Sequence, residues 1–209
     1  MPTHRIQIEC RRCGECCRKG GPAFHLEDRG LIETGQIAAK FLFTIRKGEP
    51  AYNNVTGFLI PSPSDIIKIK GKKESWSCLF FEEPYADCRI YEYRPVECRI
   101  LKCWEPAALE RMYDKNRLTR KDLLQEIKGL WDIVEEHSVK CAYETIRAVL
   151  LEDGKKKTAG YSKKLNEMIF YESELRALTV EKAKLDPELL DFIFGRPLSE
   201  TLSNMIRMR

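Results

Sequence analysis

The residues of this chain that are best suited to chemistry are its cysteines, eight of which fall into two sets. The first set places four thiols within eight residues, at Cys10, Cys13, Cys16 and Cys17. The second set lies downstream in an aromatic-rich stretch, at Cys78, Cys88, Cys98 and Cys103. Thiolates are the usual ligands of structural zinc and of iron–sulfur clusters. We therefore expect these eight side chains to be metal ligands.

The spacing within the first set indicates which metal centre to expect. Cys10, Cys13 and Cys16 have C-x2-C-x2-C spacing, which lets three thiolates of one tight loop converge on a [4Fe-4S] cluster. A zinc site more often combines one C-x2-C pair with a second pair from a distance, and this sequence permits that too. The spacing favours an iron–sulfur cluster, with zinc as the alternative. The adjacent side chains of Cys16 and Cys17 should diverge, so we expect them to be inequivalent.

The order of these motifs resembles the CxxCxxCC, or YkgJ-type, family of zinc- or iron-chelating cysteine-cluster proteins. The resemblance extends from residue 10 to about residue 103 and includes the run Cys88-Arg89-Ile90-Tyr91-x2-Arg94-Pro95-x2-Cys98-Arg99. It implies metal binding by seven cysteines, namely Cys10, Cys13, Cys16, Cys17, Cys78, Cys88 and Cys98. Cys103 is added as an eighth ligand only from the count. A related cluster occurs in flagellin lysine methylases, which makes a protein-modifying enzyme such as a lysine methylase a weaker alternative.

Two arginines beside Cys98 are expected to support the metal ligands. A metal centre bound by thiolates carries excess negative charge, which nearby guanidinium groups neutralise or to which they donate N–H groups. Arg94 and Arg99 are placed to do this, so we assign them to the cofactor site.

The other candidate ligands are expected to be structural. His25 and His137 are interpreted as surface or core side chains, and Cys141 as a buried thiol on an amphipathic helix. His4 lies close enough to Cys10 in sequence to replace a thiol.

Short elements should position the cysteines, and longer helices should follow them. Around the cysteines the pattern predicts strands at 5–9 and 66–70, the second as an edge strand, and helices at 26–34 and 38–46. Thr119-Arg120-Lys121-Asp122 resembles a capping box that begins a helix with one apolar stripe from Leu123 to Val134. Further helices are expected from Ser138 to Gly154 and at 161–177, 187–194 and 199–208.

These elements predict an α+β fold that is mostly helical. Residues 1–104 are expected to form a metal-stapled, cysteine-rich domain with short strands. Residues 105–209 are expected to form a helical region, either separate or packed on the first as one unit. Few long apolar stripes occur before residue 104, so bound metal should contribute to folding there.

Composition indicates neither a nucleic-acid binder nor a membrane protein. The 36 basic and 32 acidic side chains give a net charge of +4, without the basic stripe typical of nucleic-acid binders. No apolar run approaches the ~20 residues of a membrane span, and no secretory signal precedes the cysteines. We therefore expect a cytoplasmic protein, in which nine cysteines are more plausible as ligands than as disulfides.

Two functions from different classes follow. The leading one is a cytoplasmic protein with a Cys-ligated iron–sulfur cluster, used in electron transfer or as an accessory to redox or protein-modification chemistry. The alternative is a structural zinc module for protein–protein interaction, in which the helical region docks a protein partner. The chain lacks a nucleotide-binding glycine loop and a metalloprotease signature, so no catalytic residue is assigned.

Overall fold

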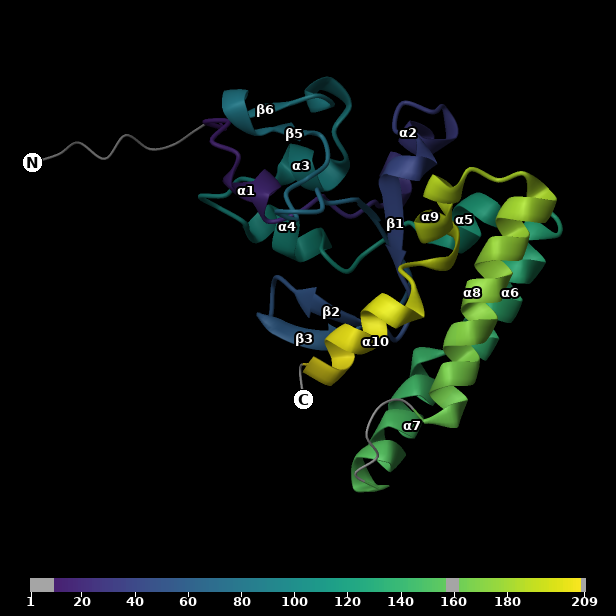
Figure 1. Ribbon diagram of the computed structural model, residues 1–209. Coiled ribbons are helices and arrows are strands. Elements are labelled where there is room, and N and C mark those ends of the chain that lie inside the picture. Colours follow the sequence, from purple (N-terminus) through teal and green to yellow (C-terminus); the bar gives the residue numbers. More distant parts are fainter. Residues whose placement is uncertain (1–9, 157–161, 208–209) are drawn as a thin grey trace, which may run out of the picture. The chain divides into compact units, whose positions relative to one another are not determined.

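A computed structural model describes residues 10–156 and 162–207 of the chain (Figure 1). The protein is α+β and 51% helical, with two-stranded sheets in its N-terminal half and helices in its C-terminal half. This architecture confirms the predicted fold class. The strand expected at 5–9 and His4 lie outside the described residues.

The chain forms two compact units that alternate along the sequence. The first unit consists of Met1–Ile37 and Lys68–Leu118, and the second of Ala38–Ile67 and Thr119–Arg209. All eight clustered cysteines belong to the first unit. The predicted boundary at residue 104 stays a prediction for independently folding domains.

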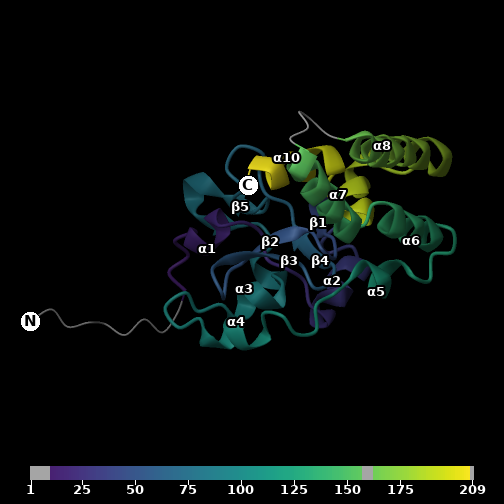
Figure 2. The ribbon, with the colours of Figure 1, turned by 90° about the horizontal axis from the view of Figure 1, so that it is seen from below.

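The first unit consists of short elements joined by turns. Its described helices and strands are α1 (Glu15–Arg18), η1 (Leu26–Asp28), α2 (Arg29–Glu33), β5 (Phe81–Glu82), η3 (Glu83–Tyr85), β6 (Asp87–Cys88), η4 (Tyr91–Tyr93), α3 (Val96–Ile100) and α4 (Ala107–Met112). Helices α3 and α4 lie side by side in both views (Figures 1 and 2). The antiparallel pair β5–β6 aligns Phe81 with Cys88. Buried apolar side chains include Phe24, Ile69, Phe80, Phe81, Ile90, Val96 and Leu118.

The second unit contains a β-hairpin and the long helices. Its described elements are η2 (Ala39–Phe41), β1 (Leu42–Ile45), β2 (Pro50–Asn53), β3 (Phe58–Pro61), α5 (Arg120–Leu124), α6 (Leu130–Lys140), α7 (Tyr143–Lys156), α8 (Lys163–Ala183), η5 (Pro187–Leu189), α9 (Leu190–Phe194) and α10 (Leu198–Arg207). Strands β2 and β3 form an antiparallel hairpin in which Ala51 pairs with Ile60. The strand β4 (Ile66–Ile69) pairs with β1, begins in the second unit and ends in the first. It confirms the strand predicted at 66–70.

The capping box is confirmed and explains where α5 begins. The backbone N–H of Thr119 donates to Oδ2 of Asp122 at 2.8 Å, and the Thr119 side chain accepts from the backbone N–H of Asp122. These reciprocal bonds satisfy donors that the first helical turn leaves open. Farther along, α7, α8 and α10 bury a common apolar cluster of Cys141, Tyr143, Ile146, Val149, Leu150, Leu165, Met168, Leu198 and Leu202.

Three predicted helices differ from the structure. The helix predicted at 38–46 is wrong, because after one turn of 3-10 helix the chain continues as the strand β1. Aromatic and β-branched residues dominate there, and Thr44 donates its hydroxyl to the carbonyl of Phe192 at 2.7 Å. The single helix expected through Val134 is interrupted at Gly129, whose φ of +80° ends the preceding turn. Ser138 lies inside α6 rather than at a helix start.

None of the helices in the described part of the chain is long and apolar enough to cross a membrane. This agrees with the sequence, which contains no apolar run of that length.

Candidate metal centre

The first cysteine set lies on a turn that leads into α1, where glycine is required. Gly14 has a φ of +78°, in the left-handed region that favours glycine. A Cβ atom at this position would lie 2.2 Å from Cζ of Phe81, which is 1% exposed. The turn that separates Cys13 from Cys16 is therefore held against the second cysteine region by a close packing contact.

Cys16 and Cys17 are neighbours on α1 whose sulfur atoms interact with each other. Their Sγ atoms lie 3.9 Å apart. The hydrogen bond with Cys17 lowers the pKa of the Cys16 thiol to about 6, and the same contact raises the pKa of Cys17. The two thiols are thus inequivalent, because Cys16 ionises readily while Cys17 retains its proton.

Backbone pairing brings the second cysteine set to the first. The N–H of Cys78 donates to the carbonyl of Cys17 at 2.8 Å, which joins the two cysteine regions directly. Cys88 lies on β6 opposite Phe81, the residue that contacts Gly14. Cys98 lies in the middle of the short helix α3. Four separate segments therefore supply the thiols of this region.

Five thiols interact electrostatically and form what we call the five-thiol cluster, which consists of Cys16, Cys17, Cys78, Cys88 and Cys98. Burial raises the pKa of Cys98 well above its usual value, and the charges of Cys78, Cys16 and Cys88 raise it further. Burial likewise raises the pKa of Cys78 and of Cys88, with added contributions from other cluster members. Charges interact over distances up to about 10 Å, so these interactions place the five thiols in one region of the first unit.

The three other predicted ligands, Cys10, Cys13 and Cys103, have exposed side chains. Cys10 and Cys13 are exposed, although the backbone N–H of Arg12 reaches Sγ of Cys10 at 3.3 Å. Cys103 is exposed on the segment between α3 and α4. Cys16 is exposed as well, so within the described part of the chain these three thiols differ from the cluster in lacking an interaction with its members rather than in exposure.

The donor chemistry of the cluster fits a soft metal. In residues 10–156 and 162–207, no three His, Cys, Asp or Glu side chains are arranged as a ready metal-coordinating group. The five-thiol cluster nevertheless offers sulfur donors from four segments, and such thiols are costly to ionise together without a cation between them. A metal would relieve this repulsion, and the residues that would hold it are the thiolates of the cluster.

Arg94 is placed beside the cluster, as the sequence predicted. Its positive charge acts to lower the pKa of Cys16 and Cys88, alongside the larger effects of the Cys17 hydrogen bond and of burial respectively. Its guanidinium carbon lies 3.6 Å from the ring centroid of Tyr91. Nε of Arg94 is buried and has no hydrogen-bond partner among the described residues. This donor is available to a thiolate or to an inorganic sulfide.

Arg99 has a different place from Arg94. Its Nη1 donates to the carbonyl of Arg94 at 2.9 Å, and its Nη2 donates to Oε1 of Glu27 at 2.5 Å. The contacts of Arg99 thus fix the backbone that carries Arg94, and the side chain holds helix α3 to η1.

A buried ionic group beneath Cys98 escaped the sequence analysis. Oε1 of Glu97 accepts a hydrogen bond from Arg117 at 2.8 Å and lies 3.3 Å from Nε2 of His25, and its Oε2 accepts from Ala23 N at 2.7 Å. Burial alone would raise the pKa of Glu97, but these partners and Lys68 hold it below its usual value. His25 is therefore a core side chain, one of the two roles expected for it.

Lys68 brings a second positive charge to the cluster. Burial lowers its pKa, while the charges of Glu97, Cys98 and Cys78 counteract that effect. The only sequence signals for these residues were the position of Glu97 next to Cys98 and the alternation of β4, and neither indicates a partner across the fold.

The remaining two expectations concern the second unit. Cys141 is buried, and burial raises its pKa to about 12, as expected of a structural thiol. His137 is fully buried and contacts Oε1 of Glu172 at 3.1 Å. Both are core side chains, and neither belongs to the five-thiol cluster.

Comparisons with known proteins identify the family. The chain matches the family model CxxCxxCC, described as "Putative zinc- or iron-chelating domain", over residues 9–117. No curated protein and no solved structure matches the chain. The matched residues include both cysteine sets, Arg94 and Arg99, and they cover more than half of the sequence. The chain therefore belongs to the CxxCxxCC family of zinc- or iron-chelating domains.

Proposed function

We propose that four thiolates, drawn from the five-thiol cluster and from Cys10 or Cys13, hold an iron–sulfur cluster. The observation that supports this most strongly is the 2.8 Å bond from Cys78 N to Cys17 O, which joins the two cysteine regions. A protein-bound iron–sulfur cluster supplies one-electron transfer or an anchoring point for reactive groups. The protein would use it in electron transfer or as an accessory to redox or protein-modification chemistry.

The surrounding charges support a centre that is itself negative. Four thiolates around a [4Fe-4S]²⁺ core or a Zn²⁺ ion leave a net charge of about −2. The charge of Arg94 acts on Cys16 and Cys88, and the charge of Lys68 acts on Cys78 and Cys98, so two cations lie near the cluster. This arrangement supports either metal, whereas the C-x2-C-x2-C spacing favours iron–sulfur.

The test is anaerobic purification followed by analysis of iron, acid-labile sulfide and zinc. A brown protein with stoichiometric iron and sulfide is expected. Cys98→Ser should lose most of the metal, because the Cys98 thiol interacts with those of Cys16, Cys78 and Cys88. Cys141→Ala is the matched control, since it removes a buried thiol of the second unit and should leave the metal content unchanged.

Zinc is the second candidate, because the family description names it and because four segments meeting at sulfur also suit a zinc site with four cysteine ligands. A colourless protein with stoichiometric zinc and no sulfide would replace the iron–sulfur proposal with a structural zinc module. In that case we expect a protein partner to bind the second unit.

A further inference from the structure

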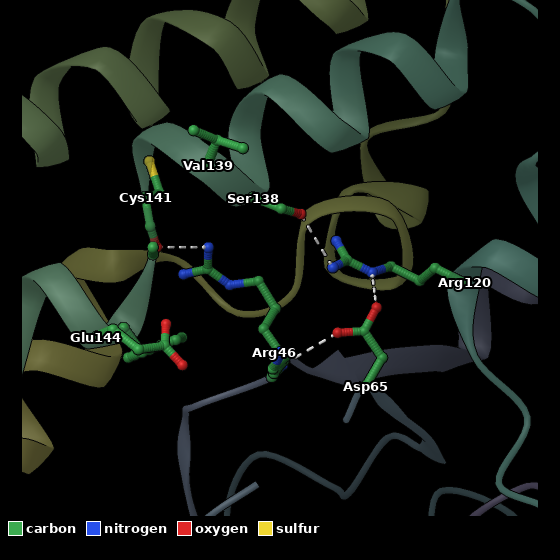
Figure 3. A pocket seen from close by; sticks show the side chains of 10 residues that line it. Arg46, Asp65, Arg120, Ser138, Val139, Cys141 and Glu144 are labelled. Carbon is green, nitrogen blue, oxygen red and sulfur yellow. Dashed lines mark hydrogen bonds and ion pairs between the residues drawn. The ribbon is translucent and has the colours of Figure 1, made fainter. Parts of the chain in front are cut away.

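A cavity of about 390 Å³ lies in the second unit, apart from the five-thiol cluster (Figure 3). The end of β1, the start of β4, α5 and the turn between α6 and α7 supply its lining. Side chains with polar or charged groups there include Arg46, Lys47, Asp65, Arg120, Ser138 and Glu144. Its volume is in the range of sites that bind small molecules.

Arg46 is the unusual member of this lining. It is 3% exposed, its Nη1 donates to the carbonyl of Cys141 at 3.2 Å, and its guanidinium carbon lies 4.6 Å from the ring centroid of Tyr143. Its Nε and Nη2 are buried and have no hydrogen-bond partner within the described ranges. A buried donor without a partner destabilises a protein by about 1–3 kcal/mol. Something that accepts hydrogen bonds is therefore missing beside Arg46.

The two open nitrogens specify the shape of the missing acceptor. Nε and Nη2 form one edge of the guanidinium plane, and that edge matches two oxygens of a carboxylate or phosphate group. Nη1, on the other edge, is already held by the Cys141 carbonyl, as the dashed line in Figure 3 marks. Arg46 therefore has the free edge that bidentate recognition of an oxyanion needs.

Protein carboxylates near Arg46 already have other partners. Oε2 of Glu49 accepts from the backbone N–H of Arg46 at 3.0 Å, and its Oε1 accepts from Arg196. Burial acts to lower the pKa of Arg46, but the charges of Tyr143, Glu172 and Glu49 and a side-chain contact with Tyr143 raise it. The oxygens of Glu172 contact His137 and Leu198 N, so neither carboxylate occupies the free edge of Arg46.

The lining as a whole has one more positive than negative side chain, because Arg46, Lys47 and Arg120 are opposed by Asp65 and Glu144. Arg120 is 3% exposed and donates from Nε to Asp65 at 2.6 Å and from Nη1 to the Ile193 carbonyl at 2.8 Å. Its Nη2 makes only a long 3.4 Å contact with Oγ of Ser138. Asp65 is thus neutralised, and Glu144 is directed to Arg147 at 3.8 Å.

We propose that this cavity binds a small molecule through a carboxylate or phosphate group, with Arg46 as the bidentate donor and Nη2 of Arg120 as an additional donor. Because Nε and Nη2 are shielded in the ligand-free protein, the side chains around them must shift as the ligand enters, while the bond from Nη1 to the Cys141 carbonyl stays in place.

The test is isothermal titration calorimetry of the full chain with two probes, inorganic phosphate and succinate, at constant ionic strength with chloride as reference. Saturable binding of at least one probe is expected, and the two probes distinguish a phosphate from a carboxylate ligand. Arg46→Gln should weaken binding at least tenfold, and Arg46→Lys should weaken it less because it keeps the charge. Arg29→Gln, which removes an exposed positive charge in the first unit, is the matched control and should bind as the wild type does.

A second variant keeps the proposal testable if Arg46→Gln does not fold. Ala142→Leu fills part of the cavity and leaves Arg46 in place, so it should also weaken binding while retaining the helical circular dichroism spectrum. The absence of saturable heat with both probes, or unchanged affinity in a folded Arg46→Gln or Ala142→Leu variant, would overturn the proposal.

Discussion

Replacing Gly14 with alanine tests how the cysteine turn is held in place. Two energies oppose the substitution. Alanine at a φ of +78° costs about 1–2 kcal/mol, and the new Cβ would lie 2.2 Å from Cζ and 2.7 Å from Cε2 of Phe81. Because Phe81 is 1% exposed and cannot move into solvent freely, relief of that overlap should cost about 1–3 kcal/mol more, as other overpacked cores do.

Gly35→Ala provides the matched control for this substitution. Gly35 lies in the same unit with a φ of +75°, and an added Cβ there would meet nothing within 4 Å. It should show the backbone cost alone, partly offset by the reduced freedom of the unfolded chain. The difference between the two variants therefore isolates the contact between Gly14 and Phe81.

The assay combines urea unfolding of the metal-loaded protein with competition for the metal by a chelator. Gly14→Ala should be less stable than Gly35→Ala by about 1–3 kcal/mol, and its metal affinity should fall by about tenfold for each 1.4 kcal/mol that the displaced turn loses. Adding Phe81→Leu to Gly14→Ala should recover part of the loss. Equal effects of the two glycine substitutions, on both stability and metal retention, would refute the reasoning.

Three further predictions concern the thiols, a buried histidine and the response to metal removal. The predicted divergence of the Cys16 and Cys17 side chains is wrong, because their Sγ atoms lie 3.9 Å apart, but their pKa shifts are opposite. Cys16→Ser and Cys17→Ser should therefore retain different amounts of metal; equal metal contents would contradict this. Burial lowers the pKa of His137 to about 4, so below pH 6.5 the unfolded chain binds a proton that the folded chain does not. The free energy of unfolding should therefore fall from pH 6.5 towards pH 4, by up to about 1.4 kcal/mol per pH unit. Urea titrations of wild type and His137→Gln should show that the variant lacks this component, and parallel pH profiles would argue against it. After chelation, hydrogen exchange should lose protection at 78–103 but retain it at 142–150; uniform loss would show that the helices depend on the metal.

Local signals in the sequence predicted elements correctly where neighbouring residues decide the structure. The capping box at Thr119 depends on a residue three positions away, and the strand β4 follows from the alternation of Ile67 and Ile69 with lysines. The predicted helix at 38–46 failed because β1 is stabilised by pairing with β4 and by the bond from Thr44 to Phe192, which lies 148 residues along the chain. Contacts at such separations leave no periodic pattern in the sequence.

The same distinction applies to the metal centre. The cysteine spacing predicted eight ligands, but the closely spaced Cys10 and Cys13 lie exposed outside the five-thiol cluster. The spacing did not indicate that the charge of Lys68 would act on Cys78 and Cys98, or that Glu97 would hold His25 and Arg117 beneath the centre. The cavity beside Arg46 was equally hidden, because its lining comes from segments separated by up to about a hundred residues.

The most direct test of the metal centre is X-ray absorption spectroscopy at the metal edge, on protein purified without oxygen. We predict a first coordination shell of sulfur alone, with an iron–iron distance in the second shell that marks a cluster. Cys98→Ser should lose this signal, and Cys141→Ala should keep it. A first shell made of nitrogen or oxygen, or a sulfur shell that persists unchanged in Cys98→Ser, would contradict the assignment of the five-thiol cluster as the metal-binding site.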